Sequence, residues 1–114
     1  VIEQVQDKAV IEGAIFLSPF LSTNPDEKIQ NFVKAYEAAY NATPDQFAAD
    51  GYDTVYTFKA AAEKAGSIKG DDLIAAMTQI TVEGTTGTMT FTADGEPNKD
   101  ANYIVIKDGK YTAR

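Results

Sequence analysis

The feature that most restricts the possible folds is a short apolar run, Gly13-Ala14-Ile15-Phe16-Leu17, which stops at Ser18-Pro19. An uninterrupted apolar run of this length, closed by proline, predicts a buried β-strand. Strands of this kind belong to parallel or mixed sheets that are covered on both faces. The run therefore predicts an α/β fold with one buried strand near its start.

Three stretches with helical spacing follow this strand. Asn24 is expected to be the N-cap of the first helix, with Glu27 completing a capping box. The second helix is expected to begin at Thr43 and to stop at Gly66. A shorter third helix is expected over residues 71–79. The apolar positions predicted to be buried are Ile29, Phe32, Val33, Tyr36, Tyr40, Phe47, Tyr52, Val55, Phe58, Ala62, Leu73, Ile74 and Met77.

The sequence pattern of the last third of the chain is typical of β-strands. Residues 88–92 alternate and are rich in β-branched side chains, which predicts a strand. Residues 103–106 predict a second strand, and Asp108-Gly109 is a strong signal for a two-residue hairpin leading into an edge strand over 110–112. The expected order is one strand, three helices and a C-terminal β-hairpin or meander, within a single unit spanning residues 1–114.

Composition removes several classes of function. The chain has 114 residues, ten Lys or Arg against 17 Asp or Glu, a net charge of −7, and neither histidine nor cysteine. Cys/His zinc sites, Cys or His nucleophiles and a histidine general base are thus excluded, and no metal site or cofactor is expected. Nucleic-acid partners are not expected, because their electrostatic footprint is basic. The chain opens on Val1 without a signal peptide, which suggests a processed chain or a fragment.

Paired carboxylates raise the possibility of hydrolytic chemistry. Asp50 and Asp53 lie three residues apart on the second predicted helix and could share one of its faces. A glycosidase needs two carboxylates at a defined separation, one of them with a raised pKa. The spacing alone does not supply these conditions, and a solvated helix face is the simpler interpretation.

Two loops have the outline of known binding motifs. Residues 84–87, Gly-Thr-Thr-Gly, follow the GxxG pattern of an RNA-binding loop, but the basic setting is missing. Residues 94–100 resemble a calcium loop without its regular acidic ligands or its closing glutamate. A turn at the start of a strand and a polar turn between strands are the favoured interpretations.

Residues beyond the end of the predicted strand, and one tyrosine of the second helix, are better candidates for ligand contacts than these two loops. Ser18 and Phe20 lie just beyond the end of the predicted strand, where ligands bind in open α/β sheets. Tyr52 follows Gly51 inside a helical pattern. A glycine in a helix interior costs about 1 kcal/mol relative to alanine, so a packing or close-approach reason is expected there.

Six segments taken in order resemble a known family. They are IEGAIFLSPF (11–20), FVKAY (32–36), FAADGYDTV (47–55), AAAEKAG (60–66), GTTGTMTF (84–91) and DGEP (94–97). Together they resemble the C-terminal part of the branched-chain amino-acid binding proteins, which are type I periplasmic solute-binding proteins of ABC importers. The resemblance extends over residues 9–111, nearly the whole chain.

The resemblance implies a partial type I periplasmic-binding-protein fold, in which two α/β lobes surround a ligand cleft. Residues 11–18 and 88–113 would be strands of the second lobe, and residues 24–80 would be helices of the first. Hinge crossings would lie near 18–20 and 87–89. In this family the tyrosine of the tyrosine-aspartate pair lies near the cleft, so the ligand-binding residues implied are Tyr52, Asp53, Ser18 and Phe20.

The implied function is that of an extracytoplasmic solute-binding component of an ABC importer, of which this chain would be a fragment. It would bind an amino acid of the branched-chain type without catalysis and present it to a membrane permease. The parent protein would be periplasmic or extracellular and anchored at the cell surface. A ligand-sensing ectodomain of a signalling receptor, with the same fold, and a carboxylate-based hydrolase remain alternatives. Helices that lack their covering lobe would expose an apolar patch, which predicts a possible homodimer of the fragment.

Overall fold

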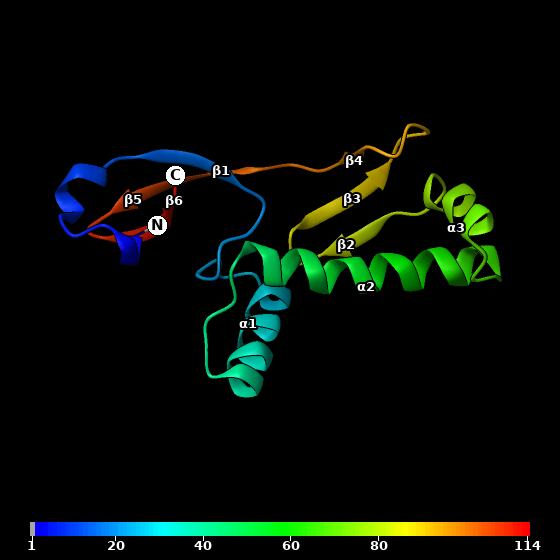
Figure 1. Cartoon of the computed structure of the whole chain (residues 1–114), viewed down its shortest axis with the longest axis horizontal. Coiled ribbons are helices and arrows are strands. Elements are labelled where there is room, and N and C mark those ends of the chain that lie inside the picture. Colours follow the sequence, from blue (N-terminus) through cyan, green and yellow to red (C-terminus); the bar gives the residue numbers. More distant parts are fainter. Residues whose placement is uncertain (1) are drawn as a thin grey trace. The chain divides into compact units, whose positions relative to one another are not determined.

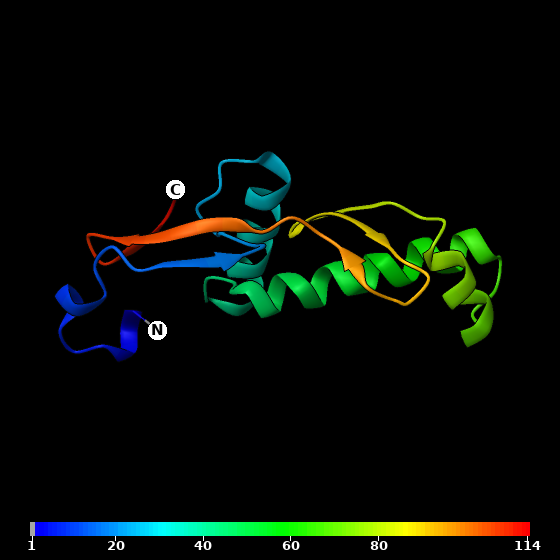
Figure 2. The same cartoon turned by 90° about the horizontal axis from the view of Figure 1, so that it is seen from above.

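The computed structural model describes residues 2–114, which form two compact units (Figure 1). One unit comprises the residues up to Asp45 together with Ala101–Arg114, and the other comprises Gln46–Asp100. The same elements are seen from above in Figure 2. In chain order the elements are η1 (Ile2–Gln4), η2 (Lys8–Ile11), β1 (Ile15–Ser18), α1 (Glu27–Tyr40), α2 (Gln46–Ala65), α3 (Gly70–Met77), β2 (Val82–Gly84), β3 (Gly87–Phe91), β4 (Pro97–Asn98), β5 (Asn102–Lys107) and β6 (Lys110–Ala113).

The first unit contains an antiparallel sheet of three strands in the order β1-β5-β6. The β5–β6 hairpin turns at Asp108 and Gly109, whose φ angles of 51° and 69° are both positive. This is the geometry of a two-residue hairpin loop that follows the twist of its strands. The hairpin predicted from the Asp-Gly pair is therefore confirmed.

Strand β1 lies where the apolar run predicted a strand, but its burial differs from the prediction. Ile15 is 48% exposed, Leu17 is 59% exposed, and only Ser18 of the four strand residues is buried. The strand also pairs antiparallel with β5. The expectation of a strand covered on both faces is thus wrong for residues 2–114, because the elements they form leave most of β1 uncovered.

Helix α1 begins later than predicted. Asp26 is the N-cap, and its carboxylate accepts hydrogen bonds from the backbone N–H groups of Lys28 and Ile29. Asn24, the predicted cap, instead accepts the N–H of Asp26 in a turn just before the helix. Both residue types can cap a helix, and the turn at Asn24 shifts the start of the helix by two residues.

Helix α2 begins at Gln46, and Thr43 does not cap it: its hydroxyl donates to the Glu37 carboxylate instead. The helix ends at Ala65, and Gly66 follows with a φ of 62°, so the predicted stop is confirmed. Helix α3 lies within one to two residues of its predicted bounds. None of the helices described in residues 2–114 combines the length and apolar character needed to cross a membrane.

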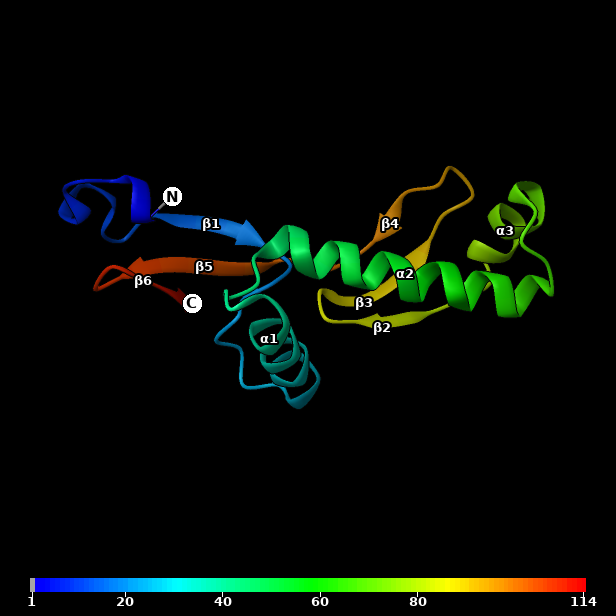
Figure 3. The ribbon, with the colours of Figure 1, turned by 60° about the horizontal axis from the view of Figure 1, so that its bottom comes forward.

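The second unit contains α2, α3 and an antiparallel sheet in the order β2-β3-β4. Strands β2 and β4 were not predicted; each is only two or three residues long. Gly84 and Gly87 pair across the β2–β3 hairpin, so Thr85 and Thr86 form its two-residue turn. Strand β2 packs on α2, as Figure 3 shows.

The face of α2 that is buried differs from the predicted one. Small and polar side chains four residues apart are buried: Ala49, Asp53, Thr57 and Ala61. Phe47, Val55 and Phe58, which were predicted to be buried, are 78%, 67% and 54% exposed. The other elements of this unit thus cover the face of α2 that carries small side chains, and they leave the face that carries large apolar side chains exposed.

Candidate functional site

Asp53 is a buried side chain of the second unit with several hydrogen-bond partners. It is 2% exposed and accepts four hydrogen bonds from the β2–β3 turn. Oδ1 accepts the backbone N–H and the hydroxyl of Thr85 at 2.8 and 2.9 Å, and Oδ2 accepts the corresponding groups of Thr86 at 2.8 and 2.6 Å. Each carboxylate oxygen is therefore bound by one threonine, and the buried anion is satisfied by donors.

The backbone at Gly84 comes very close to this carboxylate. A Cβ atom built on Gly84 would lie 2.5 Å from Cγ of Asp53 and 2.8 Å from Oδ1, and it would meet Oδ2 as well. The glycine is thus required because a backbone without a side chain is the only one that fits there. The favoured interpretation of Gly84–Gly87 as a turn is confirmed, and the structure adds that this turn binds a carboxylate.

Tyr52 lies next to Asp53 in sequence but on another side of α2. Its side chain is 41% exposed and packs against Tyr56, with ring centroids 4.9 Å apart. The hydroxyl of Tyr52 donates a hydrogen bond of 3.3 Å to that of Tyr56. This bond raises the pKa of Tyr52 above its ordinary value, and burial and the nearby negative charges raise the pKa further. The pair offers an aromatic surface with a neutral polar edge.

Ser18 and Phe20 lie in the first unit, in the segment that leaves β1. The Ser18 hydroxyl donates to the Phe20 carbonyl at 2.9 Å and accepts the Phe20 N–H at 3.3 Å, which closes a tight local turn. Phe20 is 5% exposed, and its ring meets Phe32 of α1 edge to face at 5.9 Å. Both side chains thus belong to the core of this unit, and their contact with a ligand stays a prediction.

The four predicted site residues form two pairs, each within one unit: Ser18 with Phe20, and Tyr52 with Asp53. Sequence reasoning missed Gly84, Thr85 and Thr86 as partners of Asp53. The Gly-Thr-Thr-Gly motif marked a turn, but nothing in the sequence indicated that an aspartate more than thirty residues earlier would occupy it.

Asp50 and Asp53, the two carboxylates considered for hydrolysis, have different partners. Asp50 forms an ion pair of 3.0 Å with Lys99, partly exposed to solvent. Asp53 is bound to the β2–β3 turn. The favoured interpretation of a solvated helix face is therefore wrong for Asp53, which is only 2% exposed, whereas Asp50 is partly exposed in its ion pair.

The predicted polar turn at residues 94–100 is confirmed only in its first part, because Pro97 and Asn98 form β4 and pair with β3. Thr92 and Glu96 exchange hydrogen bonds around Gly95, whose φ is 85°. No group of three or more metal-binding side chains occurs among residues 2–114.

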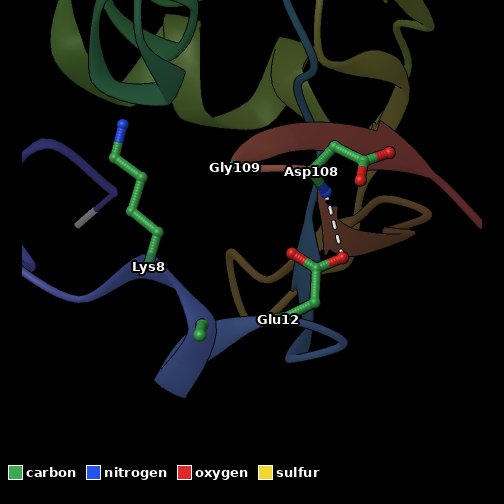
Figure 4. A pocket seen from close by; sticks show the side chains of 5 residues that line it. Lys8, Glu12, Asp108 and Gly109 are labelled. Atoms are coloured by element: carbon green, nitrogen blue, oxygen red, sulfur yellow. Dashed lines mark hydrogen bonds between the residues drawn. The ribbon is translucent and has the colours of Figure 1, made fainter.

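A shallow, open hollow lies on the first unit, lined by Lys8, Ala9, Glu12, Asp108 and Gly109 (Figure 4). The Glu12 carboxylate accepts the backbone N–H of Asp108 at 3.0 Å and so joins the segment before β1 to the β5–β6 turn. One carboxylate of this hollow is thus already used within the chain. The hollow is better explained as a surface junction than as a ligand site.

Comparison with known proteins places these elements in a family. A family model described as a periplasmic binding protein matches residues 2–110. An ABC transporter substrate-binding protein from Desulfitobacterium hafniense in complex with Leu is 27% identical over 94% of this chain, with a TM-score of 0.80. A putative branched-chain amino acid ABC transporter from Rhodospirillum rubrum is 30% identical over 91%, with a TM-score of 0.76.

A solute-binding protein of an ABC transporter from R. palustris, in complex with benzoate, is 28% identical over 90% of this chain, with a TM-score of 0.76. The aligned regions cover 32%, 31% and 29% of the Desulfitobacterium, Rhodospirillum and R. palustris chains. The chain therefore spans less than a third of the length of each of these structures.

Proposed function

The chain belongs to the periplasmic binding protein family, and from this membership we propose that it is the C-terminal part of the solute-binding component of an ABC importer. The ligand proposed is an amino acid of the branched-chain type. The mechanism is binding in a cleft between two lobes and closure around the ligand, without chemistry on it. The closed protein would then be recognised by a membrane permease, in a periplasmic or extracellular setting and with a surface anchor on the parent protein.

One observation carries this proposal: the family match spans residues 2–110. Two of the similar structures support the ligand class, since one holds Leu and another is described as a branched-chain amino acid transporter. The exposed large side chains of β1 and α2 support the view that more of the protein packs here, because large apolar patches are rarely left open. A homodimer of the fragment, joined through these faces, is proposed for the chain alone.

We assign different roles to the four site residues. Tyr52 is proposed to contact the ligand directly, because its ring is accessible and its hydroxyl is neutral at physiological pH. Ser18 and Phe20 are proposed to shape the chain at a hinge crossing, where their hydrogen bonds and ring contact hold the backbone. Asp53 is proposed to act on the ligand site indirectly, by its bonds to the β2–β3 turn, which hold α2 in place.

Benzoic-type acids are a second candidate ligand class, favoured by one observation. The Tyr52–Tyr56 pair presents two aromatic rings side by side, and aromatic pairs favour stacked or tilted contact with a further ring. The R. palustris structure with benzoate shows that such a ligand occurs among the similar proteins. Branched-chain and aromatic ligands are thus to be tested together.

The test is calorimetric titration of the full-length parent protein with leucine, isoleucine, valine and benzoate. We expect one ligand class to bind, and replacement of Tyr52→Ala to weaken binding by roughly tenfold or more, as for other aromatic contacts. Tyr40→Ala is the matched control: Tyr40 is also exposed and stacks on a neighbouring tyrosine of its own helix. Absence of binding by every ligand would refute the proposed function, and equal losses in both variants would refute the role of Tyr52.

A further inference from the structure

We infer that Asp53 is a positioning residue: by occupying a carboxylate receptor formed by the Thr85-Thr86 turn, it fixes the rotation of α2 and with it the place of Tyr52. This inference rests on the proposed function, in which Tyr52 contacts the ligand. Within the tyrosine-aspartate pair, Tyr52 contacts the ligand and Asp53 holds the helix in place.

The turn has the composition of a receptor for a single carboxylate. Its two residues offer two backbone N–H groups and two hydroxyls, and all four donate to Asp53 at 2.6–2.9 Å. Thr85 and Thr86 are each only 1% exposed, so these donors have little access to water. Buried donors need acceptors, and the carboxylate supplies all of them.

The anchor leaves little freedom for the helix to turn. Both carboxylate oxygens accept hydrogen bonds from the turn, and the Gly84 backbone lies directly against the carboxylate. Around Asp53 the buried face of α2 consists of small residues, Ala49 and Ala61, together with Thr57, whose hydroxyl donates to the Asp53 carbonyl. A rotation of α2 would therefore break several hydrogen bonds and push the carboxylate into the hairpin backbone.

Tyr52 is coupled to this anchor through the helix. Successive residues of an α-helix are separated by about 100° around the axis, so fixing Asp53 fixes the direction in which Tyr52 leaves the helix. The neighbouring Tyr56 ring and the hydroxyl contact then restrict the Tyr52 ring itself. The buried carboxylate thus sets the direction of the Tyr52 side chain, and Tyr56 restricts its ring.

Asp53→Asn is the most informative variant, because it keeps the size of the side chain. It replaces one acceptor oxygen with an NH2 group, which can accept a hydrogen bond from neither the backbone N–H nor the hydroxyl of the threonine that it faces. Asp50→Asn is the matched control, since the same change is made on the same helix one turn earlier, at a partly exposed ion pair.

The first measurement is leucine and benzoate affinity of the full-length protein carrying each variant. We expect Asp53→Asn to weaken binding of the active ligand by roughly tenfold or more, and Asp50→Asn to change it less than about twofold. In Asp53→Ala, added formate should restore affinity, because formate can fill the vacated receptor, whereas chloride at equal ionic strength should not. A folded Asp53→Asn protein with wild-type affinity would overturn the inference.

A second measurement keeps the inference testable if the proposed function fails or if Asp53→Asn does not fold. In the 114-residue chain, NMR resonances of the Tyr52 ring and its contacts with Tyr56 report the ring's position without any ligand. We expect Thr85→Val and Thr86→Val, which each remove one hydroxyl donor, to shift these resonances, while Asp50→Asn leaves them in place. Unchanged Tyr52 resonances in both threonine variants would overturn the positioning role, whatever the ligand titration shows.

Discussion

Two glycines of the second unit should respond in opposite directions to the same substitution. Gly84→Ala adds a methyl group that would overlap the Asp53 carboxylate, whereas Gly51→Ala adds one that would have no atom within 4 Å beyond its chain neighbours and the backbone of its own helix. Neither glycine has a positive φ, so backbone strain does not distinguish them. The contrast isolates the close approach between the hairpin and the helix.

The expected magnitudes follow from the contacts. Overpacking costs about 1–3 kcal/mol, and each lost hydrogen bond to a charged group costs about 1.5–3 kcal/mol. Displacement of the carboxylate with loss of one bond thus gives a loss of about 2.5–6 kcal/mol for Gly84→Ala, a large part of the roughly 5–15 kcal/mol of a whole domain. Gly51→Ala should instead raise the free energy of unfolding by about 0.5–1 kcal/mol, because alanine is favoured over glycine inside helices.

The assay is urea unfolding of the chain followed by far-UV circular dichroism. With a slope of about 2 kcal/mol per molar urea, the midpoint should fall by roughly 2 M for Gly84→Ala and rise by a few tenths molar for Gly51→Ala. In an Asp53→Ala background the cost of Gly84→Ala should largely disappear, because the clashing group is gone. A Gly84→Ala midpoint close to that of the wild type would refute the close approach.

Four further outcomes are expected. Tyr56→Phe should lower the pKa of Tyr52 towards its ordinary value of 10.0 in an absorbance titration, since it removes the acceptor of the Tyr52 hydroxyl. Because folding raises the pKa of Tyr52, the stability that this shift contributes is complete below pH 10 and is lost as the pH rises through the folded-state pKa. Urea unfolding measured across this pH range should show the loss. A stability that does not change over this range would contradict the raised pKa. Gly109→Ala should destabilise the β5–β6 turn by about 1–2 kcal/mol in urea unfolding, because alanine is strained at a φ of 69°, and a neutral effect would contradict the turn geometry. Native mass spectrometry of the chain should detect a dimer, which Val55→Glu on the exposed face of α2 should weaken; a strictly monomeric chain would contradict association through that face.

Local chemistry in the sequence determined the order of elements. The strand at Ile15–Ser18, the three helices and the β5–β6 hairpin were predicted because proline, helix stops and the Asp-Gly pair act over a few residues. Helix starts were less accurate, since Asn24, Asp26 and Thr43 all have side chains that can cap, and the neighbouring chain decides which one does. The family resemblance also came from local segments taken in order.

Only the tertiary structure decided which faces are buried and what Asp53 does. Hydrophobic spacing predicted that Phe47, Val55 and Phe58 would be buried, yet the hairpin covers the small face of α2, where its backbone can approach closely. The partnership of Asp53 with Thr85 and Thr86 joins residues that are far apart in the chain, and no local pattern records it. A buried carboxylate is stable only where donors surround it, and folding alone brings those donors together.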